Sequence, residues 1–214
     1  MFDASQPAQV VFLLVAGLLA GAVNAVAGGG SLLVFPALLA VGFPPLAANV
    51  TNSVAQWPGY VGLVLGARRD LPGQGGRIAR TSGVAALGTV VGCGLLLVAP
   101  CEVFDAVVPV LVVLASLTMA VGPWLKRTIG DPAAADRDRT GPLLVAVFVA
   151  AVYGGYFGGA LGVILISTLS LFAHDDLRRL NGLKGVLSLV VASDRKSTRL
   201  NSSHSGESRM PSSA

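Results

Sequence analysis

The sequence predicts an all-α membrane protein: a polytopic transmembrane helical bundle with two repeated halves and broken or re-entrant helices. Hydrophobic residues make up 53% of the chain and charged residues only 12%, against about 25% charged residues in a typical globular domain. No charged side chain lies between Asp3 and Arg68, although one membrane-spanning helix needs only about 20 apolar residues. The apolar runs at 10–19 and 107–117 do not alternate with polar residues, so they predict helices rather than barrel strands.

Apolar runs bounded by polar, proline or glycine clusters place the expected helices. In chain order they cover residues 8–27, 31–41, 46–67, 80–98, 104–125, 143–159, 163–173 and 180–193. The run at 31–41 is too short to cross a bilayer alone, so we expect half of a broken helix or a re-entrant segment. The N-terminus lacks the basic region of a secretory signal, so the first helix is expected to remain in the mature protein.

The loops at 68–80 and 126–139 carry most of the basic residues of the first half. The first contains Arg68, Arg69 and Arg77, and the second contains Lys126, Arg127, Arg137 and Arg139. Short loops rich in Lys and Arg stay on the cytoplasmic side of a membrane. We therefore expect both loops to be cytoplasmic, with two spans between them, in a multi-pass protein of the plasma (inner) membrane.

The chain also shows a weak internal repeat. A shift of 132 positions places Gly162 on Gly30 and Asn181 on Asn49, and the short apolar piece, the polar break and the polar helix start recur in order. Many transporters build a central site from two such halves.

Gly28, Gly29, Gly30 and Ser31 lie between two apolar segments, shortly after Asn24. Consecutive glycines let backbone N–H groups converge, and the helix that follows adds its own free N–H groups, so this point is predicted to bind an anion. The alternative is that the glycines only allow close packing of helices.

A polar cluster opens the next helix. Its members Asn49, Asn52, Ser53 and Gln56 share one helix face, and Thr51 lies among them. Uncharged polar groups at membrane depth can bind a solute without the cost of a buried charge. The alternative, compatible with binding, is that they join neighbouring helices and cap this one.

In the second half, Tyr156 ends an apolar run, and Asn181 and Lys184 follow a charged turn. We expect all three at the site, with Lys184 as a counter-charge for an anion. The alternative for Lys184 is that it extends to the membrane surface from a helix end. His174 and Asp105 are weaker candidates for proton transfer.

The sequence holds no catalytic triad, metal-binding spacing or nucleotide-binding loop. Cys93 and Cys101 are expected to be small packing residues. We therefore predict no enzyme activity, no metal and no cofactor.

Residues 194–214 resemble a translated sequencing adapter, because 194–204 and 208–214 match one reading frame of a short-read adapter. The alternative is a disordered Ser-rich basic tail. We expect a permease domain over residues 1–193, incomplete because the native protein continues beyond it. Without the four basic and two acidic residues of this segment the net charge falls from +4 to +2, so no nucleic-acid partner is predicted.

Two motifs resemble the signatures of the TauE/SafE family of membrane permeases. The first is GAVNAVAGGGSLLVFPALL at 21–39 with GFPP at 42–45 and ANVTNS at 48–53, and the second is YGGYFGG at 153–159 with LNGLK at 180–184. The resemblance covers about residues 8–193. It implies two repeated halves and the export of sulfite or the movement of organosulfur anions.

The predicted function is secondary transport of a small anion, with sulfite or an organosulfonate implied by the resemblance. The expected partners are membrane lipid and the anionic solute, and a homo-oligomer is compatible with this interpretation. One alternative is a membrane subunit that docks a partner enzyme through the loops at 68–80 and 126–139. A membrane-embedded enzyme is the third interpretation.

Overall fold

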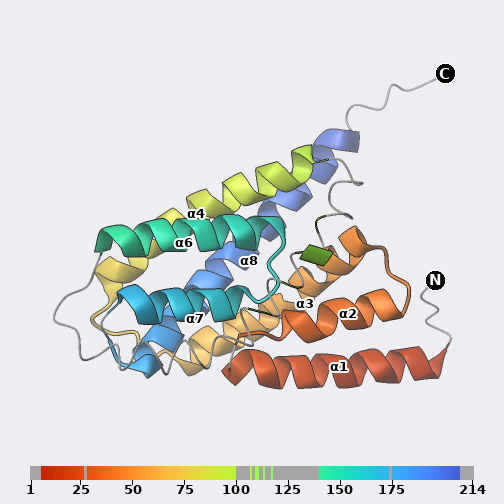
Figure 1. Cartoon of the computed structure of the whole chain (residues 1–214), viewed down its shortest axis with the longest axis horizontal. Helices are drawn as coiled ribbons and strands as arrows, with labels where there is room; N and C mark the ends of the chain where they lie inside the picture. Colours follow the sequence, from red (N-terminus) through yellow and green to blue (C-terminus); the bar gives the residue numbers. More distant parts are fainter. Residues whose placement is uncertain are drawn as a thin grey trace.

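The computed structural model describes residues 6–26, 28–99, 140–173 and 175–207, with a few scattered positions between 107 and 117. Within these ranges every regular element is an α-helix (Figure 1). The helices are α1 (Pro7–Val26), α2 (Ser31–Ala40), α3 (Pro45–Gly66), α4 (Gly75–Val98), α6 (Thr140–Tyr156), α7 (Leu161–Phe172) and α8 (Leu177–Glu207). The predicted all-α class is confirmed. Apart from those scattered positions, the helix expected at 104–125 lies outside the described residues, as do the basic residues at 126–139, Cys101, Asp105 and His174.

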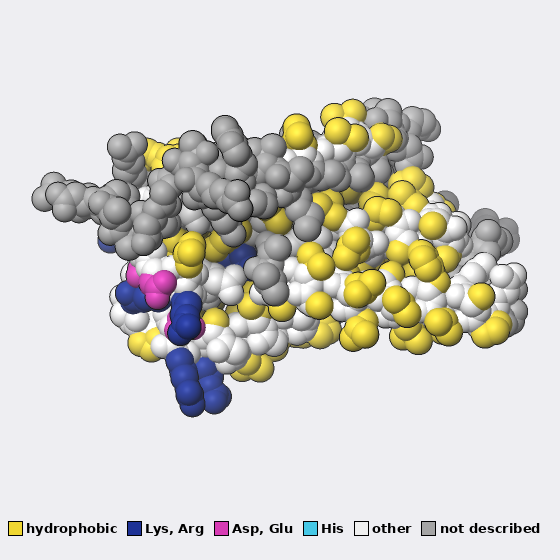
Figure 2. Space-filling view, turned by 60° about the horizontal axis from the view of Figure 1, so that its bottom comes forward, with side chains coloured by type: hydrophobic (Ala, Val, Ile, Leu, Met, Phe, Trp, Pro, Cys, Tyr) yellow, Lys and Arg dark blue, Asp and Glu magenta, His cyan; other side chains and the backbone are white. Residues whose placement is uncertain are grey.

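Among the residues that the structure describes, two helices are long and apolar enough to cross a bilayer by length and composition, namely Pro7–Ala25 with a mean hydropathy of 2.0 and Gly75–Val98 with 1.9. Large apolar side chains on α1, α4 and α6 are exposed, among them Val11, Leu14, Leu18, Val90, Leu95, Val145 and Val149. In Figure 2, hydrophobic side chains spread over much of the described surface, whereas Lys and Arg gather at one end. This distribution suits a bundle surrounded by lipid with one basic end.

The two halves of the chain form an inverted repeat. With a shift of 132 positions, the last residue of α2 falls on the last residue of α7, and the first residue of α3 falls on the first residue of α8. Gly28 falls on Ala160, and both have positive φ angles, +82° and +56°. Figure 1 shows that each helix of the first half runs opposite to its counterpart in the second: α1 to α6, α2 to α7 and α3 to α8. The repeat predicted from the sequence therefore has the inverted topology of many transporters.

The helix α2 is the short element predicted at 31–41, and α7 is its counterpart in the second half. They have 10 and 12 residues, which at about 1.5 Å per residue is roughly half of a bilayer core of about 30 Å. In Figure 1 they start near each other in the middle of the bundle and run toward opposite ends. Their N-termini, the positive ends of their dipoles, thus lie at the centre of the structure.

Apolar packing fixes this arrangement. One buried cluster joins α6, α7 and α8 through residues such as Val147, Leu165 and Leu187. A second joins α2 to the α6–α7 connection, where the rings of Phe35 and Phe157 meet edge to face with centroids 5.3 Å apart. The region where α7 starts is thereby packed against α2 of the first half and against α6 and α8 of the second.

Candidate functional site

The two halves cross in direct backbone contact at the starts of α2 and α7. A Cβ atom added to Gly28 would lie 2.7 Å from Cα of Gly162, and one added to Gly30 would lie 2.8 Å from Cβ of Asn24. Atoms this close would clash, so only glycine fits at either position. Gly28, Gly29 and Gly30 are all buried. For Gly28 and Gly30 the structure therefore supports the alternative interpretation, in which the glycines allow close packing of helices.

Ser31 ties the first half to the second at the same crossing. Its Oγ accepts a hydrogen bond of 2.9 Å from the backbone N–H of Ala160. The side chain is 1% exposed, so this donor and acceptor satisfy each other away from water. Ser31 thus holds the crossing of the two halves together.

The polar face of α3 exists as predicted, and it is bonded along its own helix. Gln56 donates from Nε2 to Oδ1 of Asn52 at 2.7 Å, and the hydroxyl of Tyr60 donates to Oε1 of Gln56 at 2.8 Å. Ser53 donates to the backbone oxygen of Asn49 at 2.7 Å. Tyr60 continues the stripe one turn beyond Gln56 and was not among the predicted site residues.

Two spaces border this face, a pocket of about 230 Å³ beside Ser53 and a much smaller void, and Arg195 of the adapter-like segment lines both. Asn52, Ser53, Gln56 and Tyr60 border a void of about 20 Å³, which is enough for about one water. Asn49 is fully buried, and its Nδ2 has no hydrogen-bond partner among the described residues. Its Oδ1 accepts from Arg195 at 3.1 Å, and Arg195 lies in the segment that the sequence predicts to be a translated adapter. Thr51 is exposed and points away from this face.

On α8, a second polar face corresponds to that of α3. The shift of 132 places Asn181 on Asn49 and Lys184 on Asn52. Lys184 is 1% exposed, so its side chain does not reach the surface as the alternative interpretation required. Beside it, a Cβ added to Gly185 would lie 3.1 Å from Leu63, so α3 and α8 pack closely at this level.

An opening beside predicted site residues lies between α1, α3 and the start of α8. This opening, the asparagine cavity, has a volume of about 440 Å³ and contains Asn24 and Asn181. It is otherwise lined by Gly21, Ala25, Gly59, Gly62, Leu63, Gly66, Ala67, Asp70 and Arg178. Cβ atoms added to Gly21, Gly62 or Gly66 would meet nothing within 4 Å. Small residues thus create the space.

Asn24 is the most buried polar group of this cavity. It is 8% exposed, and its Oδ1 has no hydrogen-bond partner among the described residues. Asn181 faces the same space from the other half of the repeat, and Arg178, one turn earlier on α8, adds a positive charge near the basic end. A buried amide oxygen without a partner is costly in a protein interior, which makes Oδ1 of Asn24 a candidate acceptor for a hydrogen bond from water or from a solute that carries a donor.

Comparison with known proteins places this geometry in a family. A family model described as sulfite exporter TauE/SafE matches residues 13–193. The chain belongs to the TauE/SafE family. Its relatives include a Sinorhizobium protein named probable membrane transporter protein ORF9, 31% identical over 157 residues, and the probable membrane transporter protein YfcA of Escherichia coli K12, 30% identical over 166 residues.

These alignments cover 72% and 73% of the chain but only 58% and 57% of the two relatives, so the chain spans little more than half of their length. No solved structure matches this TauE/SafE chain.

The TauE/SafE chain thus brings some predicted site residues together and keeps others apart. Asn24 and Asn181, which come from opposite halves, share one cavity. Tyr156 is partly buried against the apolar cluster around Phe35 instead. The sequence prediction missed Arg178 and the small residues that line the cavity. The spacing of Gly59, Gly62 and Gly66, at i, i+3 and i+7, was the available signal for one open helix face.

Proposed function

We propose that this chain is part of a secondary transporter that moves a small anion, sulfite or an organosulfonate, as a multi-pass protein of the plasma (inner) membrane. The observation that carries the proposal is that Asn24 and Asn181, one from each inverted half, line a single cavity of about 440 Å³. In transporters built from inverted repeats, substrate sites lie where the two halves meet. The description of the family as sulfite exporters supports the choice of substrate.

The lining of the asparagine cavity suits an oxyanion. Amide N–H groups of Asn24 and Asn181 can donate hydrogen bonds to sulfur-bound oxygens, and Arg178 supplies the positive charge. Asp70, near the same end, reduces the net charge of the lining to zero. Arg178 and the amide donors hold an anion locally, and the opposing charge of Asp70 keeps that binding weak enough for the release that transport requires.

The polar groups near the centre then have a supporting role. We place the solute beside Asn24 and Asn181 rather than against Gly28–Gly30, because Gly28 is in backbone contact with Gly162 of the other half and Gly30 is packed against α1. Gly28, Gly162 and Ser31 form a fixed crossing about which the halves can rock. Lys184, buried on the same helix as Asn181, adds a positive charge within the bundle that favours an anion over a cation.

The test is anion flux into vesicles that contain the full-length protein with its native C-terminal sequence. Asn24→Ala and Asn181→Ala should each lower sulfite flux at least tenfold, because each removes a donor worth roughly 1.5 kcal/mol to a charged solute. Gly62→Leu should block flux by filling the cavity, since a Cβ at Gly62 meets nothing within 4 Å. Thr51→Ala is the matched control because Thr51 is exposed on another face of α3.

Normal flux in both asparagine variants would remove the cavity from the proposal. If the wild-type protein moves neither sulfite nor organosulfonates but co-purifies with an enzyme, the alternative of a docking subunit would replace transport.

A further inference from the structure

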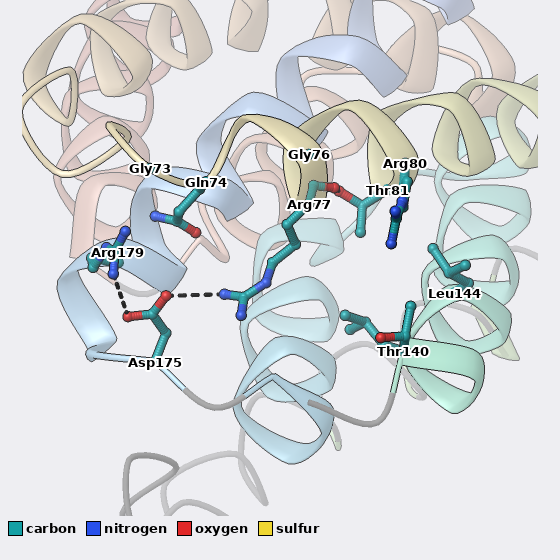
Figure 3. A pocket seen from close by; sticks show the side chains of 11 residues that line it. Gly73, Gln74, Gly76, Arg77, Arg80, Thr81, Thr140, Leu144, Asp175 and Arg179 are labelled. Carbon is teal, nitrogen blue, oxygen red and sulfur yellow. Dashed lines mark hydrogen bonds and ion pairs between the residues drawn. The ribbon is translucent and has the colours of Figure 1, made fainter. Parts of the chain in front are cut away.

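A second cavity, separate from the asparagine cavity, lies where three helices begin. It has a volume of about 430 Å³ and shares no lining residue with the asparagine cavity. Its walls come from the first turns of α4 and α6 and from the segment that leads into α8 (Figure 3). We call it the arginine pocket, because three of its lining residues are Arg77, Arg80 and Arg179.

The arginine pocket carries an excess of positive charge. Asp175 lies between two of the arginines, with Oδ2 3.0 Å from Nη1 of Arg77 and Oδ1 3.1 Å from Nη1 of Arg179. Arg80 is exposed and extends from α4 on the other side of the space (Figure 3). Three guanidinium groups and one carboxylate give the lining a formal charge of +2. An anion with up to two negative charges would balance it.

Backbone groups add to this field. The N-termini of α4, at Gly75, and of α6, at Thr140, border the pocket. Each helix start has backbone N–H groups without partners in its own helix, and it is the positive end of the helix dipole. Guanidinium groups, helix N-termini and the hydroxyl of Thr140 are the donors that bind phosphate in proteins.

Gln74 indicates which oxyanion the pocket prefers. Its side chain is 4% exposed, its Nε2 donates to the backbone oxygen of Asp70 at 3.0 Å, and its Oε1 has no hydrogen-bond partner among the described residues. An amide oxygen can only accept a hydrogen bond. It therefore favours an oxyanion that keeps one hydroxyl, which hydrogen phosphate has and sulfate lacks.

We propose that the arginine pocket binds a phosphate group that carries one hydroxyl, supplied either by inorganic phosphate or by the head group of a monoester phospholipid. The phosphate oxygens take hydrogen bonds from Arg80 and from the two arginines that now share Asp175. Because Asp175 links α4 to the start of α8, an occupant of the pocket competes with a bond between the two halves of the repeat.

The test uses the full-length protein at pH 7 with ionic strength held constant by potassium chloride. Sodium phosphate should bind in calorimetric titration and raise the unfolding temperature, and sodium sulfate should bind more weakly. In a parallel arm, the protein is placed in phosphatidylcholine nanodiscs with or without phosphatidic acid, and the unfolding temperature is compared. An effect in the first arm identifies the free ion as the source, and an effect in the second alone identifies the lipid.

Arg80→Gln should weaken phosphate binding about tenfold or more, the usual effect of losing a charge-assisted hydrogen bond. Arg68→Gln removes the same charge from an exposed position outside the pocket and should leave binding unchanged. The proposal is overturned if neither arm shows binding, if sulfate binds as well as phosphate, or if both variants weaken binding equally. None of these results depends on anion flux, so they are separate from the test of transport.

Discussion

Alanine at position 28 should destabilise the protein, whereas alanine in place of a first-half glycine that faces open space should not. The added Cβ would lie 2.7 Å from Cα of Gly162, and the residue has φ +82°. Inserting a methyl group into a packed contact costs about 1–3 kcal/mol, and a left-handed φ costs an L-residue another 1–2 kcal/mol or so. We therefore expect Gly28→Ala to lower the free energy of unfolding by about 2–5 kcal/mol.

Gly162→Ala separates these two causes. Its Cβ would meet the same contact from the other side, 2.7 Å from Cα of Gly28, but Gly162 lies inside α7 and has no positive φ. The loss should thus be about 1–3 kcal/mol, from the steric clash alone. Gly17→Ala on α1 is the control, because its Cβ meets nothing within 4 Å, and alanine favours a helix over glycine by about 1 kcal/mol.

The measurement is reversible unfolding in mixed micelles of a mild detergent and dodecyl sulfate, followed by helical circular dichroism. The expected order of stability is Gly17→Ala at or above wild type, then Gly162→Ala, then Gly28→Ala. If Gly28→Ala and Gly17→Ala unfold alike, the two halves do not meet at this point and the proposed crossing is wrong.

Two further predictions concern hydrogen bonds near the crossing. Ser31→Ala leaves the N–H of Ala160 without its acceptor and should cost about 1–3 kcal/mol of unfolding free energy; faster hydrogen exchange at the Ala160 amide checks it, and unchanged exchange would contradict it. Asn52→Ala and Tyr60→Phe each remove one bond to Gln56 and should cost about 1 kcal/mol apiece. Because both bonds meet at Gln56, their costs should not add in a double-mutant cycle, and strict additivity would argue against a connected chain.

Helix boundaries show what hydropathy can and cannot predict. The sequence placed the start of the fourth helix at residue 80 and of the last at residue 180, whereas α4 begins at Gly75 and α8 at Leu177. The missing turns contain Arg77, Arg178 and Arg179, which hydropathy excludes from a span. A helix can extend beyond the apolar layer, so the apolar run marks the membrane and not the end of the helix.

The sequence predicted which site residues share a helix face, but it did not predict which residues of different helices meet. Spacing alone put Asn49, Asn52, Ser53 and Gln56 on one face, and the structure agrees. The meeting of Asn24 with Asn181 depends on how two inverted halves pack, which no local pattern in the sequence determines. The same holds for the glycines, because their φ angles could be expected but their contact partner could not.

The bond between Ser31 and Ala160 has a consequence for how the protein is made. The two residues are separated by 129 positions, which a ribosome that adds about 5–20 residues per second needs roughly 6–26 s to translate. Throughout that interval the nascent first half is in the membrane while Ser31 has no Ala160 to bond with. The contact between the halves can therefore form only after the second half has been translated. Until then the incomplete chain is exposed to membrane quality-control proteases.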